Sequence, residues 1–311
     1  MTATSPSTQG SPLATFALFA YNQEQYIRDA ITAAFAQTYE PLEIILSDDA
    51  SSDRTFEIMQ DMTSSYTGPH IVRLRRSANN LGLASHINVI AEEFTGKYLV
   101  LAAGDDISFP ERTAACVAIL EEKGVSLVHS MVTYIDTDNR TISHHRSHEP
   151  LLWGHADGSS AAGSLSLYIG ATGAVTRDFL EKFGPISYHN AYEDLVFGFR
   201  SILGGGSYFI RKNLVRYRFG CGISHNRTDL TVGEMLAKEK RRLMAYADVY
   251  RQRLRDLDAV SEDYSQVREF LIVKLHEMTL RIARRKSLIA FTLACLSKPA
   301  TTFRVIAKRA L

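Results

Sequence analysis

The chain has 311 residues, of which 45% are hydrophobic and 22% charged, the composition of a soluble globular protein. This length accommodates one large α/β domain with an appendage, or two modest domains. The three cysteines, Cys116, Cys221 and Cys295, form no metal-spaced pair and favour a reducing compartment. Residues 1–12 form a Ser/Thr-rich tail rather than a signal peptide, and the apolar stretch 287–297 is too short to span a bilayer. We therefore expect a cytoplasmic protein.

The net charge of +1 conceals an asymmetry along the chain. No acidic residue follows Glu277, whereas eight basic residues do, which leaves 27 basic against 34 acidic residues before position 278. The eight basic residues are Arg281, Arg284, Arg285, Lys286, Lys298, Arg304, Lys308 and Arg309. An acidic body with a basic tail suggests that the tail meets a polyanionic surface.

Over the first 122 residues, short apolar runs alternate with segments of helical periodicity. The pattern predicts strands at 14–20, 41–46, 71–74 and 98–103. Helices are expected at 24–37, from the polar turn 47–53 to about 62, at 83–94 and at 110–122. Strands that alternate with helices at this spacing indicate βαβ units and a parallel sheet.

Two of the predicted strands end in paired carboxylates, Asp48-Asp49 and Asp105-Asp106. Parallel strands end at the same edge of a sheet, where open α/β sheets bind their ligands, so the two pairs are expected to face one crevice. Adjacent carboxylates repel one another unless a cation lies between them or they divide the roles of metal ligand and hydrogen-bond acceptor. The plainer alternative is a solvated turn that caps the next helix.

Two common phosphate-binding motifs are missing from the sequence. No Gly-x-Gly-x-x-Gly follows the first strand, and no Gly-x-x-x-x-Gly-Lys-Ser/Thr occurs. These absences disfavour a dinucleotide-binding dehydrogenase and a P-loop enzyme. If phosphates bind here, a divalent cation held by carboxylates is the favoured device.

The second half of the chain begins with a predicted strand at 126–134 and a polar, His- and Gly-rich insertion at 136–163. A helix at 177–183 and a strand at 208–218 follow, and from residue 231 the pattern is helical and charged. Within the insertion, His144, His145 and His148 are interpreted as solvated rather than as a metal cluster, and Trp153 as an anchor to the core or a platform for an acceptor sugar.

Several segments, each weak alone, form an ordered set that covers about residues 13 to 226. They are Ala20-Tyr-Asn-Gln-Glu-Gln-Tyr-Ile27, the stretch 37–55 with Ser47-Asp-Asp-Ala-Ser-Ser-Asp53, Asn80-Leu-Gly-Leu-Ala84, Thr95 to Val100 leading to Gly104-Asp-Asp106 and Pro110, Tyr192-Glu-Asp194 with Arg200, and Val215-Arg-Tyr-Arg218. This order resembles that of the family-2 glycosyltransferases. The resemblance implies the glycosyltransferase A fold, a Rossmann-like, mostly parallel sheet flanked by helices, here with a C-terminal helical appendage.

The resemblance also implies transfer of a sugar, with inversion, from a nucleotide-diphosphate donor to a hydroxyl of a saccharide or lipid-linked acceptor. Uridine diphosphate donors are the commonest in the family. On this basis the donor is held by Tyr21, Asn22, Asp48, Asp49 and Asp105, and Mn²⁺ or Mg²⁺ by Asp106, with Asp105 as a second ligand. Asp194 is the candidate general base, and its neighbour Glu193 raises its pKa or contacts acceptor.

The sequence departs from the family pattern at two positions. Ala103 stands where the family's Asp-x-Asp begins, which leaves open whether Asp105 or Asp106 is the main metal ligand. Phe219 stands where a His often follows Tyr-Arg, and His225 is the nearby substitute. The missing acid motivates a second hypothesis, a non-catalytic sugar-nucleotide-binding or scaffold protein. A nucleotidyltransferase is disfavoured because the first strand is followed by Tyr21-Asn-Gln-Glu24 instead of a basic Gly-rich loop.

Glu193 and Asp194 also have a purely structural interpretation, in which they form an N-cap pair that stabilises the first turn of a helix through Arg200.

We divide the chain into a disordered tail at 1–12, a catalytic domain at 13–226 and a basic helical region at 227–311. Leu271, Leu275, Met278 and Ile282 share one helical face, which suits packing on the catalytic domain or contact of 270–311 with an anionic membrane. Nucleic acid is disfavoured as a partner because the tail lacks a nucleic-acid-binding motif and interleaved aromatic residues.

Overall fold

The computed structural model describes residues 10–143, 158–221 and 230–310. Its centre is a sheet of eight strands in the order β3-β2-β1-β4-β7-β6-β8-β5. The strands are β1 (Ala14–Ala20), β2 (Leu42–Asp48), β3 (Ile71–Arg76), β4 (Tyr98–Ala103), β5 (Ile107–Ser108), β6 (Leu127–Ile135), β7 (Ala174–Thr176) and β8 (Ser207–Arg218). From β3 to β4 all neighbouring strands are parallel, while β7 and β5 pair antiparallel with their neighbours.

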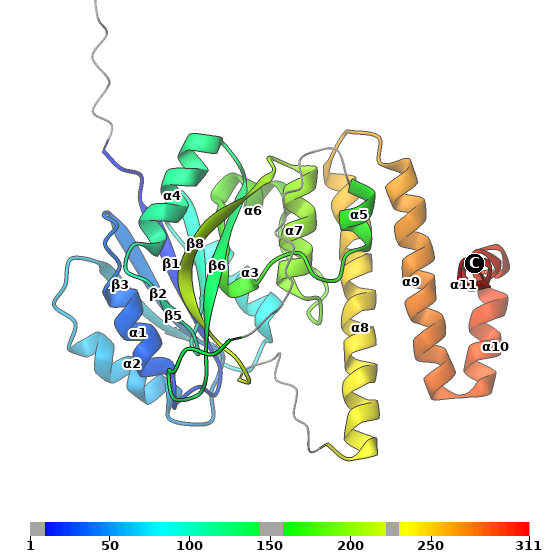
Figure 1. Cartoon of the computed structure of the whole chain (residues 1–311), viewed down its shortest axis with the longest axis horizontal. Coiled ribbons are helices and arrows are strands. Elements are labelled where there is room, and N and C mark those ends of the chain that lie inside the picture. The colour runs from blue at the N-terminus through cyan, green and yellow to red at the C-terminus, as the bar shows by residue number, and fades with distance from the viewer. Residues whose placement is uncertain (1–9, 144–157, 222–229, 311) are drawn as a thin grey trace, which may run out of the picture.

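Helices cover both faces of the sheet (Figure 1). They are α1 (Ile27–Phe35), α2 (Thr55–Ser64), α3 (Leu83–Glu93), α4 (Arg112–Lys123), α5 (Gly158–Gly163), α6 (Arg177–Phe183), α7 (Glu193–Leu203), α8 (Val232–Asp256), α9 (Ser265–Lys286), α10 (Leu288–Ser297) and α11 (Pro299–Ala310). One core lies between the sheet and α1, α2 and α4, and the other between the sheet and α3, α6, α7, α8 and α9. Successive residues of β1 serve the two cores alternately, because strand side chains point to opposite faces. Phe16 and Leu18 face the first core, and Ala17 and Phe19 the second.

Strand register brings the two carboxylate turns to either side of β1. Ala20 is paired with Asp48 on β2, and Phe19 is paired with Ala103 on β4. The carbonyl of Ala20 accepts a hydrogen bond of 2.9 Å from the amide of Asp49, and the carbonyl of Phe19 accepts one of 2.9 Å from the amide of Gly104. The end of β1 therefore fixes both turns at the same edge of the sheet, as predicted.

The sequence predicts the central strands well, because each is a continuous apolar run with a polar end. The strands at 14–20 and 98–103 and the helix at 177–183 agree with the structure residue for residue. Strand β2 continues two residues beyond its predicted end and includes Asp48. Neither the three-residue β7 nor the two-residue β5 was expected, since such short strands have too few residues to show an alternating pattern.

The C-terminal region is helical, as expected, and its first two long helices share the second core. Leu271 and Met278, on the apolar face noted in the sequence, are buried there, so this face packs inside the protein. Buried Arg253 ties α8 to its neighbours through hydrogen bonds to the carbonyls of Ala162 at 2.8 Å and Leu195 at 2.9 Å. Within the described residues, no helix combines the length and the apolar character required of a membrane span.

Candidate active site

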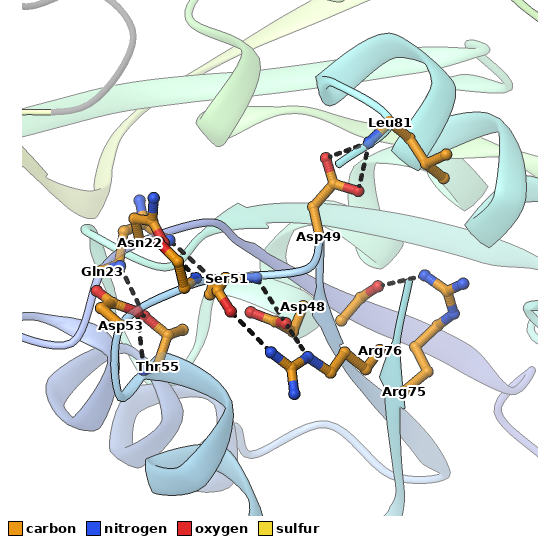
Figure 2. A network of polar contacts seen from close by, with 12 residues as sticks. Asn22, Gln23, Asp48, Asp49, Ser51, Asp53, Thr55, Arg75, Arg76 and Leu81 are labelled. Atoms are coloured by element: carbon orange, nitrogen blue, oxygen red, sulfur yellow. Dashed lines mark hydrogen bonds and ion pairs between the residues drawn. The ribbon is translucent and has the colours of Figure 1, made fainter. Parts of the chain in front are cut away.

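The turns that follow β1 and β2 are joined by reciprocal hydrogen bonds (Figure 2). The amide of Asn22 donates to the hydroxyl of Ser51 at 2.8 Å, and the amide of Ser52 donates to the side-chain oxygen of Asn22 at 2.8 Å. Asn22 has a left-handed backbone with φ of 51°, a conformation that Asn tolerates better than most residues. Asn22 therefore organises the two turns, whereas Tyr21 beside it has a side chain 46% exposed and open to a ligand.

Asp48 is fully buried at the end of β2. Its Oδ2 accepts a hydrogen bond of 3.0 Å from the amide of Ser51 and lies 3.2 Å from Nε of Arg76. The same guanidinium donates to the carbonyl of Ser51 at 2.7 Å, so Arg76 braces the turn from β3 (Figure 2). Oδ1 of Asp48 has no hydrogen-bond partner among the described residues, which leaves one buried acceptor for a ligand group.

The carboxylate of Asp49 is already engaged by the chain. It accepts hydrogen bonds from the amide of Leu81 at 2.9 and 3.1 Å and from that of Gly82 at 2.9 Å. Gly82 has φ of 76°, a left-handed conformation that favours glycine, and the next residue begins α3. In this structure Asp49 thus positions the loop before α3, and the predicted contact of Asp49 with nucleotide stays a prediction.

Asp105 and Asp106 follow β4 and are both largely buried, with 9% and 5% exposure. Oδ1 of Asp106 accepts a hydrogen bond of 2.8 Å from the amide of Arg218, and Nε of Arg218 donates to the carbonyl of Asp105 at 2.9 Å. Oδ2 of Asp106 is buried without a partner among the described residues. Burial raises the pKa of Asp105, and burial together with the charge of Asp105 raises the pKa of Asp106 well above its usual range.

These two carboxylates fit a divalent cation that completes its coordination with ligands from outside the protein. Oδ2 of Asp106, which has no partner among the described residues, is a hard oxygen donor, and a cation here would offset the burial that raises the pKa values of both carboxylates. No group of three or more His, Cys, Asp or Glu side chains in the described parts of the chain is arranged to hold a metal. Mg²⁺ commonly uses one or two carboxylates together with substrate phosphates and water, and this donor set matches that pattern.

Gln23 links the turn after β1 with the turn after β4. A Cβ atom on Gly104 would collide with Oε1 of Gln23, so the side chain of Gln23 packs directly on the glycine of the β4 turn. On its other side, the amide of Gln23 donates to the hydroxyl of Thr55 at 2.7 Å (Figure 2). Gln23 therefore connects the two carboxylate turns, which the sequence had predicted to share one crevice.

Glu193 and Asp194 lie at the start of α7, next to the short helical turn 170–172. The carboxylate of Glu193 packs directly on Gly170, where a Cβ atom would collide with Oε1. Gly173 at the end of this turn accepts a hydrogen bond of 2.9 Å from the amide of Leu101 on β4, so the turn connects Glu193 to the strand that carries Asp105. The carboxylate turns and the Glu193–Asp194 pair, which are the two predicted halves of the site, therefore both connect to β4.

The pKa values of this second carboxylate pair are both raised. Burial, with the charge of Asp194, raises the pKa of Glu193 to about 8. Burial raises the pKa of Asp194 to about 6, against the opposing hydrogen bond of 2.7 Å that the amide of Leu195 donates to its Oδ1. The hydroxyl of Tyr168, buried without a described partner, is held neutral by burial and by the charges of both carboxylates, which raise its pKa well above the usual range. One member of the pair is thus ionised near neutral pH while the other retains its proton.

Arg200 does not stabilise the start of α7, as the structural alternative for Glu193 and Asp194 required. It is fully buried and forms a two-point ion pair with Asp256 at the end of α8, with both N–O distances 3.0 Å. Tyr192 occupies the N-cap position of α7, with no side-chain capping bond. Arg200 therefore joins α7 to α8, and that part of the alternative is wrong.

The sequence alone assigns no role to three arginines at the site. Arg76, at the end of β3, is paired with Asp48. Arg112 is buried beneath the β4 turn and donates to the carbonyl of Leu101 at 2.6 Å, while Arg218 donates to the carboxylate of Asp106 and to the backbone carbonyl of Asp105. Arg76 and Arg218 meet their carboxylate partners across long sequence separations, where local patterns carry no signal. Phe219 is 41% exposed, and His225, the histidines at 144, 145 and 148, and Trp153 lie outside the described residues.

A parallel sheet with carboxylate turns on both sides of its first strand, continued by a mixed half that carries a second carboxylate pair, defines the glycosyltransferase A class of fold. The model of glycosyl transferase family 2 matches residues 15–184, more than half of the chain. The chain belongs to this family. The matched region runs from β1 to the end of α6 and so includes both carboxylate turns, whereas Glu193 and Asp194 lie beyond it.

The chain is similar to proteins named as glycosyltransferases. EpsE of Bacillus subtilis (strain 168) is 35% identical over 102 residues, which are 33% of this chain and 36% of EpsE. An uncharacterized glycosyltransferase of Haemophilus influenzae is 32% identical over 114 residues, 37% of this chain and 34% of that protein. The matches to these curated relatives thus span about a third of their length.

Solved structures share the fold at low sequence identity. Residues 1–349 of TarS from S. aureus in complex with UDP-GlcNAc give a TM-score of 0.59 at 15% identity, covering 94% of this chain and 79% of that one. The mannosyltransferase PcManGT from Pyrobaculum calidifontis, in complex with GDP-Man and Mn²⁺, gives 0.59 at 16% identity, covering 98% and 81%. At these identities the likeness establishes the fold alone.

Proposed function

We propose that the protein transfers a sugar from a nucleotide-diphosphate donor, a UDP-sugar in the first instance, to a hydroxyl of a saccharide or lipid-linked acceptor with inversion, in the synthesis of a cell-surface polysaccharide or glycolipid. The single observation that carries this proposal is the pair of carboxylate turns held on either side of β1, each with a buried oxygen that has no partner among the described residues. Family membership supports the reaction class. The two structural neighbours in complex with UDP-GlcNAc and with GDP-Man support the donor class.

The donor is proposed to lie along the ends of β1, β2 and β4. Tyr21, with its exposed ring, stacks on the nucleotide base, and the free Oδ1 of Asp48 accepts a hydrogen bond from base or ribose. Asn22 and Asp49 shape the surrounding turns by their hydrogen bonds to Ser51 and Leu81, and Asp105 contacts the ribose. Each of these residues comes from a turn that the strands fix in place, so little ordering is required when the donor binds.

Asp106, with Asp105 beside it, would hold Mn²⁺ or Mg²⁺. When bound, this cation supplies Lewis-acid stabilisation for the negative charge of the leaving diphosphate. The amide of Arg218 bonds to Oδ1 of Asp106 and so fixes the orientation of the carboxylate. Oδ2 accepts no hydrogen bond from the described residues and is available to the cation. Ala103, in place of the family's first acid, leaves Asp106 as the stronger candidate for the main ligand.

Asp194 is proposed as the general base that removes the proton of the attacking hydroxyl. A pKa of about 6 makes it a stronger base than an ordinary aspartate while leaving it ionised at neutral pH. Inversion requires the base and the leaving diphosphate to lie on opposite faces of the sugar, and Asp194 comes from α7 rather than from the turns proposed to hold the donor. Glu193, protonated at neutral pH, can donate a hydrogen bond to an acceptor oxygen.

We further propose that the protein works in the cytoplasm, with its basic region 270–311 at the surface of an anionic membrane. The excess of basic residues after Glu277 supports this location, because anionic headgroups attract such segments.

The transfer proposal is tested by measuring release of nucleoside diphosphate from UDP-GlcNAc, UDP-glucose and GDP-mannose in the presence of Mn²⁺ and a panel of alkyl glycosides. We expect one donor to be turned over by the natural protein and not by Asp194→Asn, which should still bind that donor. Donor binding without turnover across the whole panel, independent of metal, would favour the non-catalytic alternative.

A further inference from the structure

A groove runs between α8 and α9 in the C-terminal region. Its accessible volume is about 260 Å³, and its walls come from one face of each helix. The lining residues are Lys240, Met244, Ala247, Asp248 and Arg251 on α8, and Ile282 and Lys286 on α9. The spacing of three to four residues along each helix places these side chains in two facing rows. The groove therefore has an apolar floor and cationic edges.

The positive charge of the groove is only partly neutralised. Arg251 pairs with Asp248 at 2.5 Å, and Asp248 also accepts a hydrogen bond of 3.2 Å from the side chain of Asn190. Lys240 and Lys286 are exposed and form no ion pair with any residue in the described ranges. The lining thus contains three cationic side chains and one carboxylate, that of Asp248. The groove carries a net positive charge, which suits a phosphate group.

Exposed apolar side chains lie on the elements that flank the groove. Met235, Leu236 and Met244 on α8 are 49%, 57% and 43% exposed, and Ile289, Leu293 and Leu296 on α10 are 74%, 63% and 69% exposed. The α10 residues recur at helical spacing on one face, and no described residue covers them. Of the two alternatives that the sequence left open for the apolar face of α9, the structure shows packing inside the protein, whereas the apolar face of α10 is exposed.

The same end of the molecule carries the proposed active site. Figure 1 shows the start of α8 and the turn between α9 and α10 at the lower end of the view, toward which β1 and β8 also run. A flat anionic surface that contacts the lower ends of α8 and α10 would therefore lie on the side of the sheet edge that holds both carboxylate turns. Charge and exposed apolar groups together are the features that attract a lipid bilayer.

We propose that the groove between α8 and α9 receives the phosphate of an anionic phospholipid headgroup, and that the apolar side chains of α10 and of the start of α8 enter the bilayer beside it. Lys240 and Lys286 contact the phosphate, while Met244 and Ile282 line the groove on the side of the lysines away from the bilayer. The inference rests on the membrane association in the proposed function and specifies its binding site. It does not depend on which sugar is transferred.

The test is co-sedimentation of the full chain with vesicles of phosphatidylglycerol and phosphatidylcholine, compared with vesicles of phosphatidylcholine alone. The variant is Lys240→Glu with Lys286→Glu. The matched control is Arg211→Glu with Arg255→Glu, which makes the same change of charge at two exposed positions on β8 and at the other end of α8. Since each basic side chain at an anionic surface contributes a factor of about five, we expect the groove variant to bind at least about tenfold more weakly and the control much less so.

Equal losses in the two variants, or equal binding of the natural protein to both kinds of vesicle, would overturn the proposal. Thermal unfolding of all three proteins verifies that they fold. Stabilisation by UDP with Mn²⁺ reports separately on the proposed donor site. A protein that binds anionic vesicles through the groove but does not respond to any nucleotide would retain this inference and lose the transferase proposal.

Discussion

The backbone amide of Arg218 donates a hydrogen bond of 2.8 Å to Oδ1 of Asp106, which joins the end of β8 to the turn after β4. The bond occupies one carboxylate oxygen and leaves Oδ2 buried without a described partner. The side chain of Arg218 is also buried, and it donates to the carbonyls of Asp105 and Asp136 at 2.9 and 2.8 Å. A single residue thus orients the proposed metal ligand and supports the loop around it.

The Arg218 side chain is expected to matter for folding. Arg218→Met removes donors from the buried carbonyls of Asp105 and Asp136, and we expect the free energy of unfolding to fall by about 3 kcal/mol in urea titrations. Arg140→Met is the control, because Arg140 and its partner Asp138 are exposed and such pairs contribute about 0–1 kcal/mol. Similar losses in both variants would contradict this role.

Arg76 is expected to act on both donor binding and stability. Its side chain is 46% exposed but its partner Asp48 is fully buried, so Arg76→Ala should cost about 1–3 kcal/mol of stability. Loss of the guanidinium leaves the charge of buried Asp48 uncompensated next to the proposed nucleotide site, and we expect UDP affinity, measured by calorimetry, to fall about tenfold. Arg54→Ala removes an exposed pair with Glu57 near the same turn and should leave UDP affinity unchanged.

Glu193 should make stability depend on pH in a defined direction. Because its pKa is raised from 4.5 to about 8, the folded state binds this proton more tightly than the unfolded state does. Stability from this group is therefore full at pH values below about 4.5 and is lost as pH rises to about 8. Gln cannot ionise, so Glu193→Gln does not lose stability as the pH rises. The melting temperature of this variant relative to the natural protein should therefore rise steadily between pH 5 and about pH 8. A difference that stays constant with pH would be inconsistent with a raised pKa of Glu193.

Asp194 should set the acid limb of the activity profile. With a pKa of about 6, kcat/KM for donor turnover is expected to increase with pH up to about 6 and then level off. Asp194→Asn should reduce turnover by about 10²–10⁴-fold while the dissociation constant for UDP stays the same. A variant that keeps full turnover, or a rate that is independent of pH across this range, would exclude Asp194 as the base.

The fold and the position of the two carboxylate turns at one edge of the sheet were predictable because their signals are local. Asp48 and Asp105 each end an apolar run, and parallel strands bring such ends to one edge. The arginines that hold the two carboxylate turns in place were not predictable in the same way. Arg76 and Arg218 meet their carboxylate turns only through the pairing of strands that are distant in sequence. The same holds for Arg200, whose sequence neighbours suggested a helix cap and whose partner is Asp256 on another helix.

The basic C-terminal region shows a further limit of sequence patterns. Leu271 and Met278 on α9 and Ile289 and Leu293 on α10 all belong to apolar helical segments. The first two are buried in the second core of the protein, and the second two are exposed. Periodicity identifies an apolar face and cannot specify what covers it, which depends on tertiary packing.

The central claim, a metal-dependent site for a nucleoside diphosphate at the two carboxylate turns, is tested most directly by thermal unfolding with UDP or GDP, with and without Mn²⁺. A ligand at about a hundred times its dissociation constant stabilises the folded state by about 2.7 kcal/mol, so one nucleotide with Mn²⁺ should raise the melting temperature by several degrees. In Asp106→Asn, which keeps the acceptor for the Arg218 amide, the part of this shift that requires Mn²⁺ should disappear. No shift with either nucleotide, or the same shift without Mn²⁺ and in Asp106→Asn, would contradict the account.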